Sequence, residues 1–171
     1  IEDAKRQNNS NRLQKVMEGK SEGIIFDDSQ VLDYRSHVFI KSLIIYKTQD
    51  FIGFVKFYYE NSQKKRYESK VPFESVILRK YESKKYSGKG QSYLQSFKVI
   101  LTNDIITGIS FTWSDGEVAF EGYEMESSTK FIADIGADER PISMFGSVAL
   151  QNKNMYALES LGCEVNKIDD D

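Results

Sequence analysis

The sequence predicts a single all-β domain, on three observations. The chain has 171 residues and is rich in aromatic side chains, with 11 Phe, 10 Tyr and 1 Trp. Aromatic side chains suit the half-buried surface of a β-sheet. One stretch occurs twice without a gap, at 39–62 and 93–116. Short apolar runs alternate with turn signals, and no long helical pattern occurs. A repeat inside a domain of this length indicates one supersecondary unit used more than once about an axis.

The two copies match closely enough to predict the same local structure. They read FIKSLIIYKTQDFIGFVKFYYENS and YLQSFKVILTNDIITGISFTWSDG. In each copy, two apolar runs flank a short polar turn, Thr48-Gln49-Asp50 in the first and Thr102-Asn103-Asp104 in the second. This pattern predicts two β-hairpins. The identical pairs are Ser42/Ser96, Thr48/Thr102, Asp50/Asp104 and Phe57/Phe111.

The remaining segments predict further strands and loops. GIIFDD, from Gly23, predicts a short strand that ends in an acidic turn. VPFESVIL, 71–78, predicts another strand, and RKYESKKYSGKGQS, 79–92, predicts a polar loop. GEVAFEGYEM, 116–125, follows an Asp-Gly turn signal and predicts a returning strand.

A third, looser copy closes the domain. It comprises FIADIGADERPISMFGSVAL, 131–150, followed by NMYALESLGCEV, 154–165. We match Ile142, Phe145 and Gly146 to Ile106, Ile109 and Ser110 of the second copy. Three related β units suggest a prism or a trefoil.

The ends of the chain differ in composition from this domain, which we assign to 23–166. Residues 1–22 are polar and predict a tail or linker, with a short helix as the alternative because Leu13, Val16 and Met17 have helical spacing. Residues 167–171 predict a solvated acidic end. Because the sequence opens on Ile1 without a signal-peptide pattern, we interpret it as a fragment or processed product.

The order of motifs resembles that of the jacalin-related lectins. It runs from FDD through I-x-S-L-x-I and Y-L-x-S to I-x-F-T-W-x-D-G, and closes with M-Y-A-L-E-S-L-G-C. The resemblance covers 23–165 and implies a β-prism of three pseudo-symmetric antiparallel four-stranded sheets. It also implies a non-enzymatic lectin domain that binds carbohydrate in loops at one end of the prism.

The resemblance extends, with departures, to the family's sugar-binding loop. The family pattern is Gly-x-x-x-Asp, with the Asp three residues before a glycine. With Gly162 as that glycine, Glu159 stands for the Asp and Met155 for the Gly. Glu is one methylene longer than Asp, and Met adds a side chain where the backbone approaches its ligand. The candidate carbohydrate-binding residues are Met155, Tyr156, Ala157 and Glu159, with Asp27 and Asp28 in the segment nearest to the family's glycine-rich opening.

No pattern in the sequence indicates catalysis or a cofactor. His37 is the only histidine, and no Cys/His/Asp grouping has metal-ligand spacing, so we expect no metal site. Asp27, Asp28 and the turn aspartates are better explained as turn caps than as calcium ligands. No nucleophile motif or phosphate-binding glycine loop occurs, so we expect no enzyme activity and no cofactor. Cys163 lies in an apolar run and is interpreted as a buried small side chain.

Two functions from different classes remain open on the sequence alone. The first is a lectin centred on Glu159 and Tyr156. The second is a protein-interaction or structural module of a larger assembly in which sugar binding is lost. The segment 61–92 interleaves lysines with tyrosines, but its glutamates favour an acidic protein surface over nucleic acid as a partner. The single cysteine favours an intracellular location, and no apolar run is long enough to span a membrane.

Overall fold

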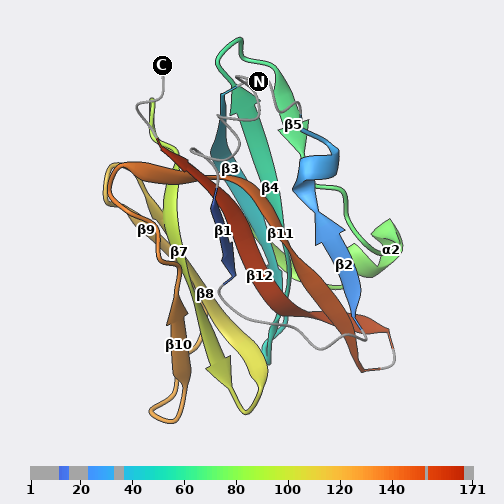
Figure 1. Ribbon diagram of the computed structural model, residues 1–171. Helices are drawn as coiled ribbons and strands as arrows, with labels where there is room; N and C mark the ends of the chain where they lie inside the picture. Colours follow the sequence, from blue (N-terminus) through green and yellow to red (C-terminus); the bar gives the residue numbers. More distant parts are fainter. Residues whose placement is uncertain (1–11, 16–22, 33–36, 153, 168–171) are drawn as a thin grey trace.

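The protein is an all-β prism built from three antiparallel four-stranded sheets (Figure 1). The computed structural model describes residues 12–15, 23–32, 37–152 and 154–167. The first sheet has the order β1-β12-β11-β2, the second β10-β7-β8-β9 and the third β5-β4-β3-β6. The predicted fold class is therefore confirmed. The bounds are β1 Arg12–Lys15, β2 Ile24–Asp27, η1 Asp28–Gln30, β3 Val38–Lys47, β4 Ile52–Asn61, β5 Arg66–Glu68, α2 Ser75–Leu78, β6 Glu82–Ser87, β7 Leu94–Thr102, β8 Ile105–Trp113, β9 Val118–Gly122, β10 Thr129–Ile132, β11 Glu139–Asn152 and β12 Met155–Lys167.

Each sheet is organised around one central hairpin, and the inner faces of the three hairpins form the core. The hairpins are β3–β4, β7–β8 and β11–β12. Along β3 and β7, the first strands of the two repeated hairpins, buried and less buried residues mostly alternate, as expected for strands with one face in a core, whereas β8 is buried along most of its length. Phe111 connects two sheets, because its ring lies 5.8 Å from Phe57 and 6.3 Å from Phe97 between centroids.

The repeat predicted at 39–62 and 93–116 is confirmed, and the two hairpins have β-bulges at equivalent positions. The three hairpins share two β-bulges, one near the start of the first strand and one near the start of the second strand, and β11–β12 has a third irregularity between Leu150 and Asn152. The first set of bulged residues is Lys41, Gln95 and Ile142. The second set is Gly53, Thr107 and Glu159. In the predicted turn of the second copy, Asn103 and Asp104 have φ values of 52° and 63°, which short polar side chains tolerate best.

The bulges also correct our alignment of the third copy. Ile142 is equivalent to Gln95 on the incoming strand, whereas the sequence match had placed it at Ile106 on the outgoing one. The third hairpin extends further past its second bulge than the other two, with Ala149 and Leu150 paired to Ala157 and Tyr156. This extra length breaks the constant spacing on which the sequence alignment relied.

Two predictions for the segment between the first two copies are wrong. The stretch 71–78 is not a strand, because bends and the single helical turn α2 occupy it. Its apolar side chains Phe73, Ile77 and Leu78 instead pack on a small cluster of Phe51, Tyr81 and Ala157. The stretch 79–92 is not only a loop, because β6 pairs with β3 along six residues. As an edge strand with a mostly exposed surface, β6 needs no apolar pattern.

The prediction of a tail or short helix over 1–22 is wrong at 12–15. These residues form β1, which pairs with Gly162–Val165 of β12, because backbone hydrogen bonds can add an edge strand whatever its polarity. Val16, Met17 and the rest of that segment lie outside the described residues, as do residues 168–171. Among the helices in the described part, none is long and apolar enough to cross a membrane.

Candidate functional site

Glu159 occupies the bulge position of β12, where the strand has one residue more than its partner. On one side of it Leu158 pairs with Val148, and on the other Ser160 pairs with Ser147. The Ser147 hydroxyl donates to Glu159 Oε1 at 3.1 Å and shares a 2.7 Å hydrogen bond with the Ser160 hydroxyl. Both serines are buried while Glu159 is partly exposed. The bulge therefore presents a carboxylate that a buried hydroxyl pair holds in place.

Gly23, directly before β2, lies against the same carboxylate. A Cβ at Gly23 would lie 2.8 Å from Glu159 Oε1 and 2.8 Å from the Val148 carbonyl oxygen. Because real Cβ atoms essentially never come that close, any other residue here would displace the Glu159 side chain or the strand. The chain entering β2 and the bulge of β12 thus form one small polar site.

The equivalent bulge positions of the other two hairpins are closed. A Cβ at Gly53 would lie 2.3 Å from Cε1 of Tyr81, so that ring fills the space beside it. Thr107 is buried, and its hydroxyl bonds with the Thr102 hydroxyl at 2.8 Å and donates to the Tyr123 carbonyl at 3.1 Å. Of the three related positions, Glu159 alone offers an ionisable and partly exposed side chain.

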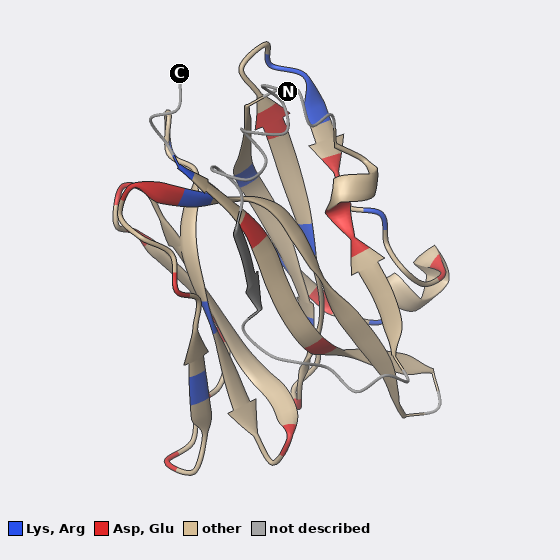
Figure 2. Cartoon of the chain, viewed as in Figure 1, with Lys and Arg blue, Asp and Glu red and all other residues tan. Residues whose placement is uncertain are grey.

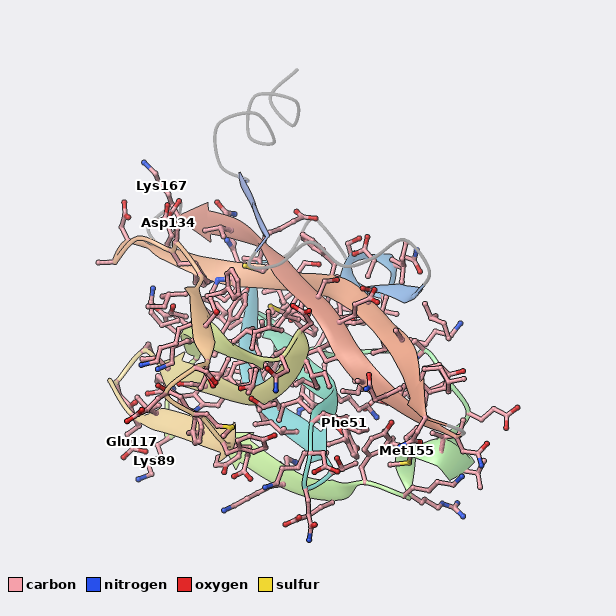
Figure 3. The ribbon with its side chains drawn as sticks, turned by 90° about the horizontal axis from the view of Figure 1, so that it is seen from below. Phe51, Lys89, Glu117, Asp134, Met155 and Lys167 are labelled. Atoms are coloured by element: carbon pink, nitrogen blue, oxygen red, sulfur yellow. The ribbon has the colours of Figure 1, made fainter. Side chains whose placement is uncertain are left out.

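The other predicted residues of this loop support the extended hairpin. Met155 packs on the cluster of Phe51, Tyr81 and Ala157, and Ala157 itself is buried. Figure 3 labels Met155 and Phe51 from this group. The Tyr156 ring stacks on Phe73 with a centroid distance of 5.0 Å and an interplanar angle of 4°. One face of Tyr156 is therefore already covered by another ring, and Met155 has its side chain in apolar packing.

Asp27 and Asp28 lie apart from Glu159. In β2, Ile24 pairs with Val148 near the bulge, whereas Asp27 pairs with Phe145 at the other end of the strand. Asp27 accepts hydrogen bonds from the backbone and side chain of Ser29, at 3.0 and 2.7 Å, and so caps η1. The structure therefore does not bring the six predicted residues into one site.

Asp28 is enclosed in the core. Its Oδ2 accepts hydrogen bonds from the Tyr59 hydroxyl at 2.5 Å and the Ser69 hydroxyl at 2.7 Å, and the Tyr59 hydroxyl also accepts from the Met144 N–H at 3.0 Å. Burial raises the pKa of Asp28 to about 6, although both hydrogen bonds act in the opposite direction. This carboxyl group joins η1, β4 and β11 rather than facing a ligand.

Comparison with solved structures finds lectins with a similar fold. A single-chain recombinant jacalin superposes with a TM-score of 0.60 at 14% identity, covering 87% of this chain and 90% of that one. A mannose binding jacalin related lectin from Ananas comosus gives 0.58 at 14% identity, with 87% and 93% covered. A prostate-specific WGA16 glycoprotein lectin gives 0.53 at 11% identity, with 84% and 94% covered. No protein-family model and no curated protein matches the sequence.

The fold is that of the jacalin-related lectins. The resemblance in motif order is confirmed at the level of architecture, and the jacalin-like prism of this chain is a lectin-like fold. Because the identities are this low, the comparison establishes the fold only. The function of the site has to be inferred from the chemistry of its residues.

Part of this candidate site in the jacalin-like prism was already a candidate from the sequence. Glu159 was found from its distance to Gly162, whereas Ser147 and Ser160 were missed because serines carry no spacing signal of their own. Gly23 could have been found, since GIIFDD takes the place of the glycine-rich opening segment. Acidic and basic residues are interspersed over the strands (Figure 2), and the described residues contain no cluster of three or more potential metal ligands.

Proposed function

We propose that this domain is a carbohydrate-binding module whose central acceptor is the Glu159 carboxylate. The observation that carries the proposal is the open bulge. Three equivalent positions exist, and the one at Glu159 holds an acidic, partly exposed side chain next to a glycine. A carboxylate accepts hydrogen bonds from neighbouring hydroxyl groups, which is how a sugar diol is bound. The likeness to a mannose binding lectin supports the same ligand class.

The departures from the family pattern shape this proposal. Ser147 donates to Oε1 of the longer Glu side chain, so we expect a sugar hydroxyl to donate to Oε2. Stacking on Phe73 leaves Tyr156 one face at most for an apolar sugar patch. We therefore expect a small neutral sugar bound mainly by polar contacts, with Gly23 supplying close backbone approach.

A glycan array followed by calorimetry tests the proposal, with mannose and galactose as the first individual probes. Glu159→Gln keeps the size of the side chain and removes its charge, and we expect it to weaken the best hit at least tenfold. Glu126→Gln, a change at an exposed loop residue, is the matched control. Unchanged affinity in the Glu159 variant, or no binding of any glycan by the wild type, contradicts the proposal.

A second function, protein binding, is favoured by the outer face of the β10-β7-β8-β9 sheet. Phe120, Ser110, Lys98 and Ile132 lie in a line across it, and Phe120 and Ile132 are 42% and 68% exposed. Val118, two residues from Phe120 on β9, is 61% exposed on the same face, and neighbouring apolar side chains on an exposed sheet face often mark a protein contact. Sedimentation of affinity-purified domain distinguishes the two functions. A complex seen with the wild type and lost in Phe120→Ser/Ile132→Ser supports protein binding, and a free monomer in both samples contradicts it.

A further inference from the structure

A hollow of about 690 Å³, lined by charged side chains, serines and tyrosines, lies on the outer face of the β5-β4-β3-β6 sheet. Its floor is formed by Ser42 and Tyr58, which are paired across β3 and β4. One side consists of Glu60, Arg66 and Glu68, and the other of Lys41, Lys85 and Ser87. Its volume falls in the range of small-ligand sites. The hollow lies on the face of a sheet and is separate from the bulge at Glu159.

Tyr58 gives the hollow an aromatic surface with cations around it. The Lys56 and Lys85 ammonium groups lie 5.3 and 5.4 Å from its ring centroid, and the ring remains partly exposed. A tyrosine ring of this kind packs on the apolar face of a sugar, while its hydroxyl and the neighbouring serines form hydrogen bonds.

The two sides of the hollow differ in charge balance. On the β5 side, Glu68 is 3.5 Å from Lys56 and Glu60 is 3.9 Å from Arg66, so the carboxylates have cationic partners. On the β6 side, Lys41 Nζ donates to the Ser92 carbonyl at 3.1 Å. Within the described residues, neither Lys41 nor Lys85 has a carboxylate inside 4 Å. The hollow therefore has uncompensated positive charge on one side only.

We propose that this hollow binds an acidic sugar, a saccharide with one carboxylate on a ring that otherwise carries hydroxyl groups. The carboxylate lies toward Lys85 and Lys41, the ring covers Tyr58, and hydroxyl groups bond with Ser42 and Glu60. A polyanion such as a nucleic acid fits worse, because Glu60 and Glu68 would repel its further charges. The inference does not depend on Glu159.

Nuclear magnetic resonance titration with paired probes tests this site. Sialyllactose and digalacturonate supply the carboxylate from two kinds of sugar, and lactose and the methyl ester of digalacturonate are their neutral counterparts. We expect at least one acidic probe to shift the amide signals around Tyr58 and Lys85, with at least fivefold higher affinity than its neutral counterpart. That affinity should fall as salt is added.

Variants decide whether the hollow is responsible. Lys85→Gln and Tyr58→Leu should each weaken the acidic probe at least fivefold, whereas Lys80→Gln, at an exposed residue in the turn after α2, should not. Thermal unfolding checks that each variant is folded. The proposal is overturned if no acidic probe binds, if the shifts map to β12, if both Lys85→Gln and Tyr58→Leu bind like the wild type, or if a single-stranded oligonucleotide binds more tightly than the sugars.

Discussion

The hydroxyl group of Tyr81 forms two hydrogen bonds with the backbone of Tyr156, donating to its carbonyl at 2.5 Å and accepting from its N–H at 2.7 Å. The two residues are 75 positions apart. The Tyr81 side chain thus supplies, at the N-terminal end of β12, the hydrogen bonds that a neighbouring strand would supply. β1 does not reach this end, because it pairs only with Gly162–Val165. Burial raises the pKa of Tyr81 to about 12, so the hydroxyl keeps its proton at all ordinary pH values.

Replacing Tyr81 with Phe should destabilise the protein by about 1–3 kcal/mol, because the Tyr156 N–H and carbonyl both lose their partner. Urea unfolding measures the loss, and hydrogen exchange should become faster at the Tyr156 amide. Tyr93→Phe is the control. Its ring packs on Phe39, and we expect a change below about 0.5 kcal/mol. Equal stability of the Tyr81 variant and the wild type would show that these hydrogen bonds contribute nothing.

The Asp28 carboxyl group should make the protein more stable as the pH falls from 7 to about 4.5. Its pKa is about 6 in the folded protein and near 3.8 in the unfolded chain, so the folded state binds more protons between these values. Stability therefore decreases as the pH rises through this window, by at most about 3 kcal/mol from this group. The pKa of Glu164, also raised by burial, adds a change of the same sign.

Asp28→Asn isolates this contribution, because it keeps the shape and removes the titration. Urea unfolding at several pH values should give a flatter profile for the variant than for the wild type. Parallel profiles for the two proteins would mean that the buried carboxyl group does not titrate in this range.

Gly146→Ala should destabilise the protein by about 1–3 kcal/mol. A Cβ there would lie 2.2 Å from the Ser160 carbonyl oxygen and 2.8 Å from Cζ of Phe26, and neither group can move without disturbing β12 or the core. Gly136→Ala is the matched control, since its Cβ would meet the ends of the flexible side chains of Asp138 and Glu139 at 3.1 Å or more. Thermal unfolding that ranks the two variants equally would contradict this expectation.

Gly23→Ala should lower sugar affinity at least fivefold, because the new methyl group takes the space of Glu159 Oε1. Calorimetry with the best glycan measures the effect, and thermal unfolding shows whether the domain stays folded. A variant that is folded and binds the glycan like the wild type would remove Gly23 from the site.

The fold was predictable because two of its three units kept their spacing. Ser42 matches Ser96, and the apolar positions that follow each serine match as well. The structure gives the two hairpins the same register. The third unit was misaligned at Ile142 because its hairpin is longer. The strand β6 and the strand β1 were missed for a different reason, since both are edge strands held by backbone pairing with little apolar pattern.

The sequence points to a residue of the candidate site only where a spacing rule applies to that residue. Glu159 follows from its position before Gly162, but the hydroxyl pair that holds it comes from two strands and is visible only in the folded chain. For Asp28, the sequence pattern suggests the wrong environment. An aspartate after a short strand suggests a surface turn, and only the packing of Tyr59 and Ser69 around it reveals a buried carboxyl group.

The closure of the bulges at Gly53 and Thr107 sets the valency of the proposed lectin. With one open position of three, a single domain presents one Glu159-type site, so it can occupy a glycan but cannot bridge two of them through these positions. Cross-linking of two glycans through Glu159-type sites alone would require a second copy of the domain, joined to the first by association or by chain connection.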